Sequence, residues 1–140
     1  MRIKIKKIHP DAMIPNYAHP GDAGMDLYIN EAVELEPGER KSIPLGIAIE
    51  IPEGYVGLIL DKSGLSHKYG IKGFGGVIDS GYRGEWHAGV MNLSDKYFKF
   101  EKGHRIGQFL VQKVEYVELE EVVELSDSSR GKGGLGSTGK

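Results

Sequence analysis

The chain has 140 residues, of which 39% are hydrophobic and 27% are charged, as in ordinary globular proteins. Eighteen basic and twenty acidic residues give a net charge of −2, so no overall positive field attracts nucleic acid. The absence of cysteine excludes disulfides, thiolate nucleophiles and cysteine-based metal centres. One domain is expected at this length, and any anion must be held by a local site.

The first segment, Arg2 to Ile8, alternates polar and apolar side chains and is predicted to form a strand with Ile3 and Ile5 on one face. It lacks the continuous apolar stretch of a secretory signal. No apolar run in the chain is long enough to span a bilayer. We therefore expect a cytoplasmic protein that does not bind membranes.

The next strong pattern is an alternating apolar run over residues 41–51, which places four isoleucines and Leu45 on one side. Pro44 within this run argues for a strand end or a sheet edge. Further strands are predicted over residues 55–60, 85–93 and 105–117, with one short helix over residues 64–69. Short strands with frequent turns predict an all-β sandwich, jelly roll or distorted barrel, followed by a glycine-rich tail after about Ser126.

Two aspartates are the first candidates for chemistry. Asp26 stands at the head of a predicted strand, and Asp79 follows an apolar pair between glycine-rich turns. A carboxylate on rigid backbone can orient a water, accept its proton or bind a magnesium-linked water. The alternative is a turn-capping aspartate, although the glycines around Asp79 favour a ligand close to the backbone. Tyr82 can stack on a sugar or base, or cover the core.

Three further clusters have groups that suit phosphate. Ser63 begins the predicted helix and can donate to a phosphate, or serve as an ordinary helix N-cap. Gln108 interrupts an apolar strand, so it either meets a ligand oxygen or faces solvent. Residues 130–140 combine three cations, two hydroxyl groups and five glycines with no acid, which suits a phosphate, although such tails are also commonly solvated and disordered.

Taken in chain order, these clusters resemble the five ordered motifs of the homotrimeric dUTPase family. The matching segments are residues 23–28, 62–66, 76–84, 103–108 and 130–139. Five motifs in the same order over nearly the whole chain make the resemblance highly specific.

The resemblance implies an all-β fold, a distorted jelly-roll barrel over residues 1–126 with at most one short helix. Residues 127–140 would form a flexible arm that closes over the active site of a neighbouring subunit in a homotrimer. The implied reaction is magnesium-assisted hydrolysis of dUTP to dUMP and pyrophosphate by water attack on the α-phosphorus. It would keep uracil out of DNA and supply dUMP for thymidylate synthesis, with no nucleic-acid partner.

By motif position, Asp79 would be the catalytic residue that orients the attacking water, and Tyr82 would pack beneath the deoxyribose. Asp26 would hold magnesium through water, while the triphosphate is the main ligand of the ion. The backbone around Gly73–Val77 would read the uracil edge. The other implied substrate-binding residues are Lys62, Ser63, Gly64, Gly76, Val77, Ile78, Arg83, Gln108, Arg130, Leu135, Gly136, Ser137 and Thr138.

Four positions depart from the family pattern. Leu135 stands where the family usually has a phenylalanine that closes over uracil, and leucine cannot stack aromatically. Lys62 replaces an arginine, which keeps the charge but loses the planar fork. Asp61 replaces the preceding proline, and Gly81 stands where an acid commonly precedes the tyrosine.

Related dCTP deaminases provide an alternative, because they share the fold and often have Asp-Pro-Gly before an aromatic residue. Deamination relies on a glutamate in the strand after the third motif, at a position that is Gly89 here. Glu85, the nearest acid, lies roughly 13 Å away on the same side of the strand. A nucleotide-binding barrel without catalysis is the other alternative, and the presence of both Asp79 and Tyr82 argues against it.

Overall fold

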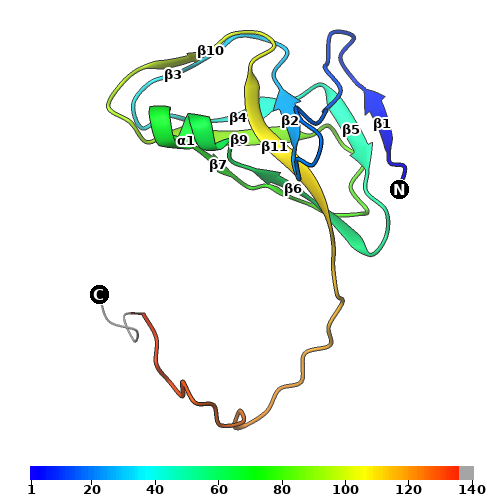
Figure 1. The fold of residues 1–140 in the computed structure, drawn as a ribbon, viewed down its shortest axis with the longest axis vertical. Coiled ribbons are helices and arrows are strands. Elements are labelled where there is room, and N and C mark those ends of the chain that lie inside the picture. The colour runs from blue at the N-terminus through cyan, green and yellow to red at the C-terminus, as the bar shows by residue number, and fades with distance from the viewer. Residues whose placement is uncertain (136–140) are drawn as a thin grey trace.

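The computed structural model describes residues 1–135, which form short strands around one hydrophobic core, with one short helix (Figure 1). The strands are β1 (Lys4–Lys7), β2 (Met25–Tyr28), β3 (Val33–Leu35), β4 (Arg40–Pro44), β5 (Ile47–Glu50), β6 (Tyr55–Leu60), β7 (Ile71–Phe74), β8 (Val77–Ile78), β9 (His87–Asn92), β10 (Phe98–Phe100) and β11 (Arg105–Lys113). The helix, α1 (Ser63–Tyr69), lies between β6 and β7.

In the described part of the chain, the strand pairs are all antiparallel and form four small sheets. The orders are β2-β11-β6-β8, β4-β9-β7, β1-β5 and β10-β3. Non-consecutive neighbours dominate these orders, as expected when a chain crosses repeatedly between the faces of a jelly roll. The predicted all-β fold with a single short helix is confirmed.

The alternating run over residues 41–51 supplies one side of the core, since Ile43, Leu45, Ile47, Ile49 and Ile51 are all buried. It is two strands rather than one, because Gly46 adopts a left-handed φ of 67° between them. Pro44 is the last residue of β4, which is an edge strand of its sheet, so both predictions for this proline are confirmed.

Strands β6 and β8 come so close at Gly76 that no side chain fits there. The Ile59 N–H donates to the Gly76 carbonyl at 2.7 Å, and a Cβ on Gly76 would lie 2.0 Å from the Ile59 carbonyl oxygen. We therefore expect Gly76→Ala to lower the free energy of unfolding by about 3 kcal/mol, as overpacking does. Urea unfolding followed by circular dichroism measures it, with Gly81→Ala as the control because space is open at Gly81. Equal stability of the two variants would contradict the prediction.

The chain leaves the barrel directly after β11, where the Val114 N–H donates to the Gly54 carbonyl at 3.0 Å. The predicted strand over residues 105–117 is therefore too long at its end. Residues 115–135 are exposed, contain no helix or strand and extend away from the barrel (Figure 1). Within residues 1–135, no helix is long and apolar enough to cross a membrane.

Candidate active site

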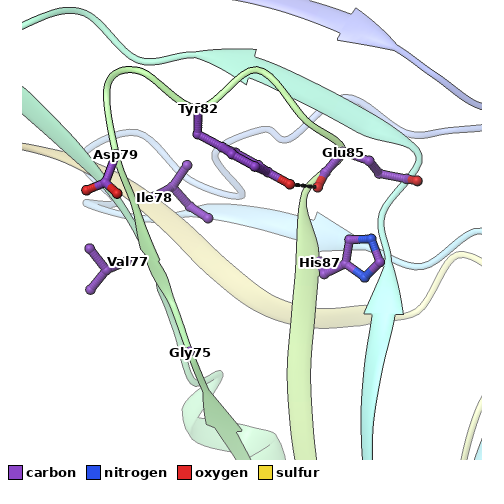
Figure 2. Close-up of a pocket in the computed structure, with 7 residues that line it drawn as sticks. All are labelled: Gly75, Val77, Ile78, Asp79, Tyr82, Glu85 and His87. Carbon is purple, nitrogen blue, oxygen red and sulfur yellow. Dashed lines mark hydrogen bonds between the residues drawn. The ribbon is translucent and has the colours of Figure 1, made fainter.

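Asp79 lies in a pocket of about 240 Å³ between β8 and the start of β9 (Figure 2). The buried Ile78 ends β8, and the exposed Asp79 side chain follows it at the rim of the barrel. The Tyr82 N–H donates to the Asp79 carbonyl at 3.1 Å, which closes the turn between them. The pocket is lined by Gly75, Val77, Ile78, Asp79, Tyr82, Glu85 and His87.

The Tyr82 side chain lies across this pocket and does not belong to the core, because 44% of it is exposed. Its hydroxyl donates to the Glu85 carbonyl at 2.8 Å (Figure 2). A Cβ on Gly84 would lie 2.5 Å from the hydroxyl oxygen, so the glycine permits this ring position. An apolar ring face fixed in this way is suited to pack against a sugar or base.

The Arg83 guanidinium, although predicted to bind substrate, is used within the turn. Its Nη1 donates to the Ser80 carbonyl at 2.6 Å and to the Tyr82 carbonyl at 3.0 Å. Its Nη2 lies 3.8 Å from a carboxylate oxygen of Glu50. Arg83 thus supports the loop that carries Asp79 and Tyr82.

Asp26 lies in a second pocket, of about 270 Å³, which β2, β11 and the residue before α1 line. The Asp26 side chain is buried, and its Oδ1 accepts a hydrogen bond from Lys62 Nζ at 2.7 Å. Arg105 Nε lies 2.7 Å from Oδ2. The neighbouring Tyr28 side chain and the Asp26 carboxylate raise the pKa of the Arg105 guanidinium, so it remains a cation here.

Gln108 shares this pocket and faces Asp26 across the β2–β11 pair. Its Nε2 donates to the Asp61 carbonyl at 2.8 Å. A Cβ on Gly24 would lie 2.7 Å from its Oε1, so the amide fits only beside a glycine. The partner of the Gln108 amide is therefore the Asp61 backbone carbonyl, which the sequence did not predict.

Ser63 and Gly64 are the first two residues of α1, and both are exposed. The N-cap is Lys62, and no side chain caps the helix. The alternative that Ser63 is an ordinary N-cap is therefore wrong. Ser63 is the first residue of the helix, directly after Lys62.

Arg130 and Leu135 lie in the exposed C-terminal segment, and neither lines the Asp79 pocket or the Asp26 pocket. Arg130 Nε donates to the Gly133 carbonyl at 2.9 Å and Nη2 to the Gly134 carbonyl at 3.3 Å. Leu135 is fully exposed. The remaining predicted residues of this segment, Gly136, Ser137 and Thr138, lie outside the described residues.

Glu85 and His87 line the Asp79 pocket but were not predicted as site residues. His87 Nδ1 lies 3.2 Å from Ser42 Oγ, and Glu85 Oε1 accepts a hydrogen bond from the Gly46 N–H at 2.8 Å. The alternation of β9 could have predicted the position of His87, because Ala88 is buried and the side chain before it must face the opposite side of the strand.

The acceptor groups of the second pocket suit a magnesium ion that arrives with phosphate. Within residues 1–135, no group of three or more His, Asp or Glu residues could hold a metal. Asp26 Oδ2 is buried and lies 2.7 Å from Arg105 Nε, in an ion pair. The pocket has two carboxylates, but Asp22 accepts the His19 N–H and both oxygens of Asp26 face cations. An ion here would therefore take most of its ligands from water and substrate phosphates.

The chain is similar to known dUTPases over nearly its full length. The dUTPase family model matches residues 10–139. The chain is 48% identical to the deoxyuridine 5'-triphosphate nucleotidohydrolase of Clostridioides difficile over 139 residues, which cover 98% of this chain and 97% of that protein. The protein of the same name from Streptomyces avermitilis is 44% identical over 142 residues, with coverages of 99% and 81%.

Solved structures show the same similarity. The Staphylococcus bacteriophage 80alpha dUTPase with dUpNHpp superimposes with a TM-score of 0.92 at 32% identity, covering 99% of each chain. A mutant dUTPase of phage phi11 of S. aureus, in which a structural Mg(II) ion is coordinated, has a TM-score of 0.84 at 26% identity and covers 91% of this chain and 100% of that one. The family match and the full-length relatives together show that the chain belongs to the dUTPase family.

Proposed function

We propose that this protein hydrolyses dUTP to dUMP and pyrophosphate by attack of water on the α-phosphorus. The observation that carries the proposal is the exposed Asp79 carboxylate, set beside the Tyr82 ring in a pocket bordered by glycine backbone. The nucleotidohydrolase relatives and the phage dUTPase with dUpNHpp support the same substrate.

The residue types of the pocket suit this reaction. Hydrolysis at phosphorus needs a positioned water and charge neutralisation, but no covalent intermediate. Asp79 orients the water and accepts its proton. Tyr82 packs beneath the deoxyribose, while the backbone from Gly75 to Ile78 lines the space for the base. Magnesium held by the triphosphate, with Asp26 behind one of its waters, supplies electrostatic stabilisation when bound.

We propose that the active site is shared between the subunits of a homotrimer. Within residues 1–135, the Asp79 pocket and the Asp26 pocket have no lining residue in common, so the sugar-binding and phosphate-binding groups are divided. The C-terminal segment also exposes apolar side chains that a neighbouring subunit would cover. These are Tyr116, Val117, Leu119, Val122, Val123, Leu125 and Leu135. Residues 127–140 are then the arm that closes over a neighbour's site, bringing Arg130, Ser137 and Thr138 to the phosphates.

The deaminase alternative conflicts with the packing of β9. A Cβ on Gly89 would lie 2.6 Å from a ring carbon of Phe74 and 2.7 Å from the Phe74 carbonyl oxygen, so this position has no room for a glutamate. Glu85 cannot easily substitute, because its carboxylate accepts the Gly46 N–H. The site therefore favours hydrolysis over deamination.

The test is incubation of the purified protein with magnesium and, separately, dUTP, dCTP, TTP and UTP. We expect dUMP and pyrophosphate from dUTP alone, which would establish discrimination against the thymine methyl group and the 2′-hydroxyl. Ammonia from dCTP would support the deaminase alternative instead. Nucleotide binding without any turnover would support a barrel that only binds.

Leu135 provides a specific test of closure over the base. We expect Leu135→Phe to lower KM for dUTP by about threefold, because an aromatic ring can stack on uracil and leucine cannot. Steady-state kinetics measures the change. Leu125→Phe is the matched control, since Leu125 is another exposed leucine of the same segment and has no predicted base contact. An unchanged or raised KM for Leu135→Phe would count against the lid role.

A further inference from the structure

Asp61 connects three segments that contain residues predicted from the family motifs to bind substrate. Its Oδ1 accepts a hydrogen bond from the Gly73 N–H at 2.8 Å, and its Oδ2 forms an ion pair with Lys72 Nζ. Its backbone carbonyl accepts the hydrogen bond from Gln108 Nε2 at 2.8 Å. Lys62, the next residue, reaches Asp26. One residue thus joins the start of α1, strand β7 and strand β11.

The contact between Asp61 and Gly73 is built into the packing. A Cβ on Gly73 would lie 2.6 Å from Asp61 Oδ1, so only glycine lets the carboxylate approach the backbone here. About three-quarters of the Asp61 side chain is buried, with 26% exposed. A carboxylate that is largely removed from water and accepts a backbone N–H forms a stronger hydrogen bond than an exposed one.

The Asp61 carboxylate ties together the two ends of the α1 segment, residues 61–73. No residue of α1 is fully buried. Leu65 packs against the core and the Tyr69 ring lies 5.0 Å from the Phe98 ring, whereas Ser63 and Gly64 at the start of the helix are exposed. Within the segment, Ser66 Oγ donates to the Ile71 carbonyl at 3.0 Å. This bond holds the C-terminal end of the helix but not its N-terminal end. Strand β7, by contrast, pairs with β9 over four residues. Loss of the carboxylate would therefore let the start of the helix move while the strand stays in place.

We infer that Asp61 is a positioning residue that holds Lys62, Ser63 and Gly64 in place for the triphosphate. The inference rests on the proposed function and on the motif positions of Lys62, Ser63 and Gly64, which the family resemblance places among the substrate-binding residues. Asp61 itself does not touch the substrate. Its carboxylate fixes the entry of α1 against Gly73, and its carbonyl orients the amide of Gln108.

The test compares two ligands by calorimetry, dUpNHpp and dUMP, in the full-length protein. Asp61→Ala is expected to raise the Kd for dUpNHpp by about tenfold. This is the change expected when one or two good hydrogen bonds to the phosphates are lost. The Kd for dUMP should change by less than about twofold, because the backbone from Gly73 onward meets the base and the β7–β9 pairing holds that backbone in place. A purely structural defect would weaken both ligands equally.

Conservative variants separate the hydrogen bond from the charge. Asp61→Asn retains an acceptor for the Gly73 N–H and should restore most of the affinity for dUpNHpp. Asp61→Glu keeps the charge but lengthens the link, so it should weaken dUpNHpp alone, and it serves if Asp61→Ala does not fold. Glu101→Ala is the matched control, because it removes the exposed Lys99–Glu101 ion pair, 2.9 Å long, and should change neither Kd.

Equal weakening of both ligands by Asp61→Ala and Asp61→Glu, or no weakening of either, would overturn the positioning role. These binding measurements need no turnover, so they are independent of the hydrolysis assay. If the wild-type protein binds dUpNHpp with the expected dependence on Asp61 but releases no pyrophosphate from dUTP, the proposed function fails and the positioning role stands.

Discussion

Replacing Asp79 by asparagine is expected to lower kcat for dUTP hydrolysis by about 10³-fold, because an amide cannot take the proton of the attacking water. The side chain is exposed, and within residues 1–135 its carboxylate has no hydrogen-bond or ion-pair partner to constrain it. Glu85, the other acid of the pocket, already accepts the Gly46 N–H. Among the residues that line the pocket, His87 is the other possible base, and its Nδ1 lies 3.2 Å from Ser42 Oγ. Asp79 is therefore the carboxylate of this pocket that is available to act as the base.

The same exposure predicts that Asp79→Asn folds normally and still binds substrate. The variant should unfold at the wild-type temperature and bind dUpNHpp with a Kd within about threefold of the wild-type value, since uniform binding is retained when only a transition-state role is lost. Asp95→Asn changes another exposed aspartate, in the loop before β10, and serves as the control. A kcat for Asp79→Asn close to that of Asp95→Asn would assign the base to a different residue.

Removal of residues 130–140 is expected to lower kcat by about 10³-fold while leaving the folded barrel intact. Arg130, Ser137 and Thr138 are proposed to hold the triphosphate, and loss of a single well-placed donor to a developing anion typically costs about 10²- to 10³-fold in kcat. An ordered arm would also exclude water from the reacting phosphates.

The position of β11 explains why stability should be unaffected. The core ends with β11 at Lys113, and residues 115–135 are exposed in the single chain. The truncated protein should show the wild-type unfolding temperature and, in analytical ultracentrifugation, the same oligomeric state as the wild type. Of the cations Arg130 and Lys132, only Arg130 is predicted to bind phosphate. We therefore expect Arg130→Ala to lower kcat more than Lys132→Ala does. Full kcat after truncation would remove the arm from the mechanism.

Sequence patterns predicted those parts of the fold that depend on local alternation. The buried positions of the apolar run over residues 41–51 follow from side-chain periodicity, and the predictions of β6 and of one short helix near residue 64 are confirmed. Strands β3, β8 and β10 have only two or three residues, too few for a period to appear. Their pairing is set by long-range contacts, such as the register of β10 against β3.

The candidate site shows the same division. Asp79 and Tyr82 were predicted from their motif, and the structure brings them together in one pocket. The bond from Gln108 to the Asp61 carbonyl joins residues 47 positions apart and has no sequence signature. Asp26 forms ion pairs with Lys62 and with Arg105. These three residues are far apart in the chain, so their meeting could not be predicted from the sequence.

The only tryptophan of the chain, Trp86, is fully buried and packs edge-on against Phe109 with ring centroids 4.8 Å apart. Within residues 1–135, its indole Nε1 has no hydrogen-bond acceptor. Its fluorescence therefore reports a dry, rigid environment and should shift to longer wavelength only when water enters the barrel. Because the C-terminal arm contains no tryptophan, this emission would follow unfolding of the core separately from events on the arm. The protein thus contains its own optical probe for distinguishing a variant that has lost its fold from one that has lost its chemistry.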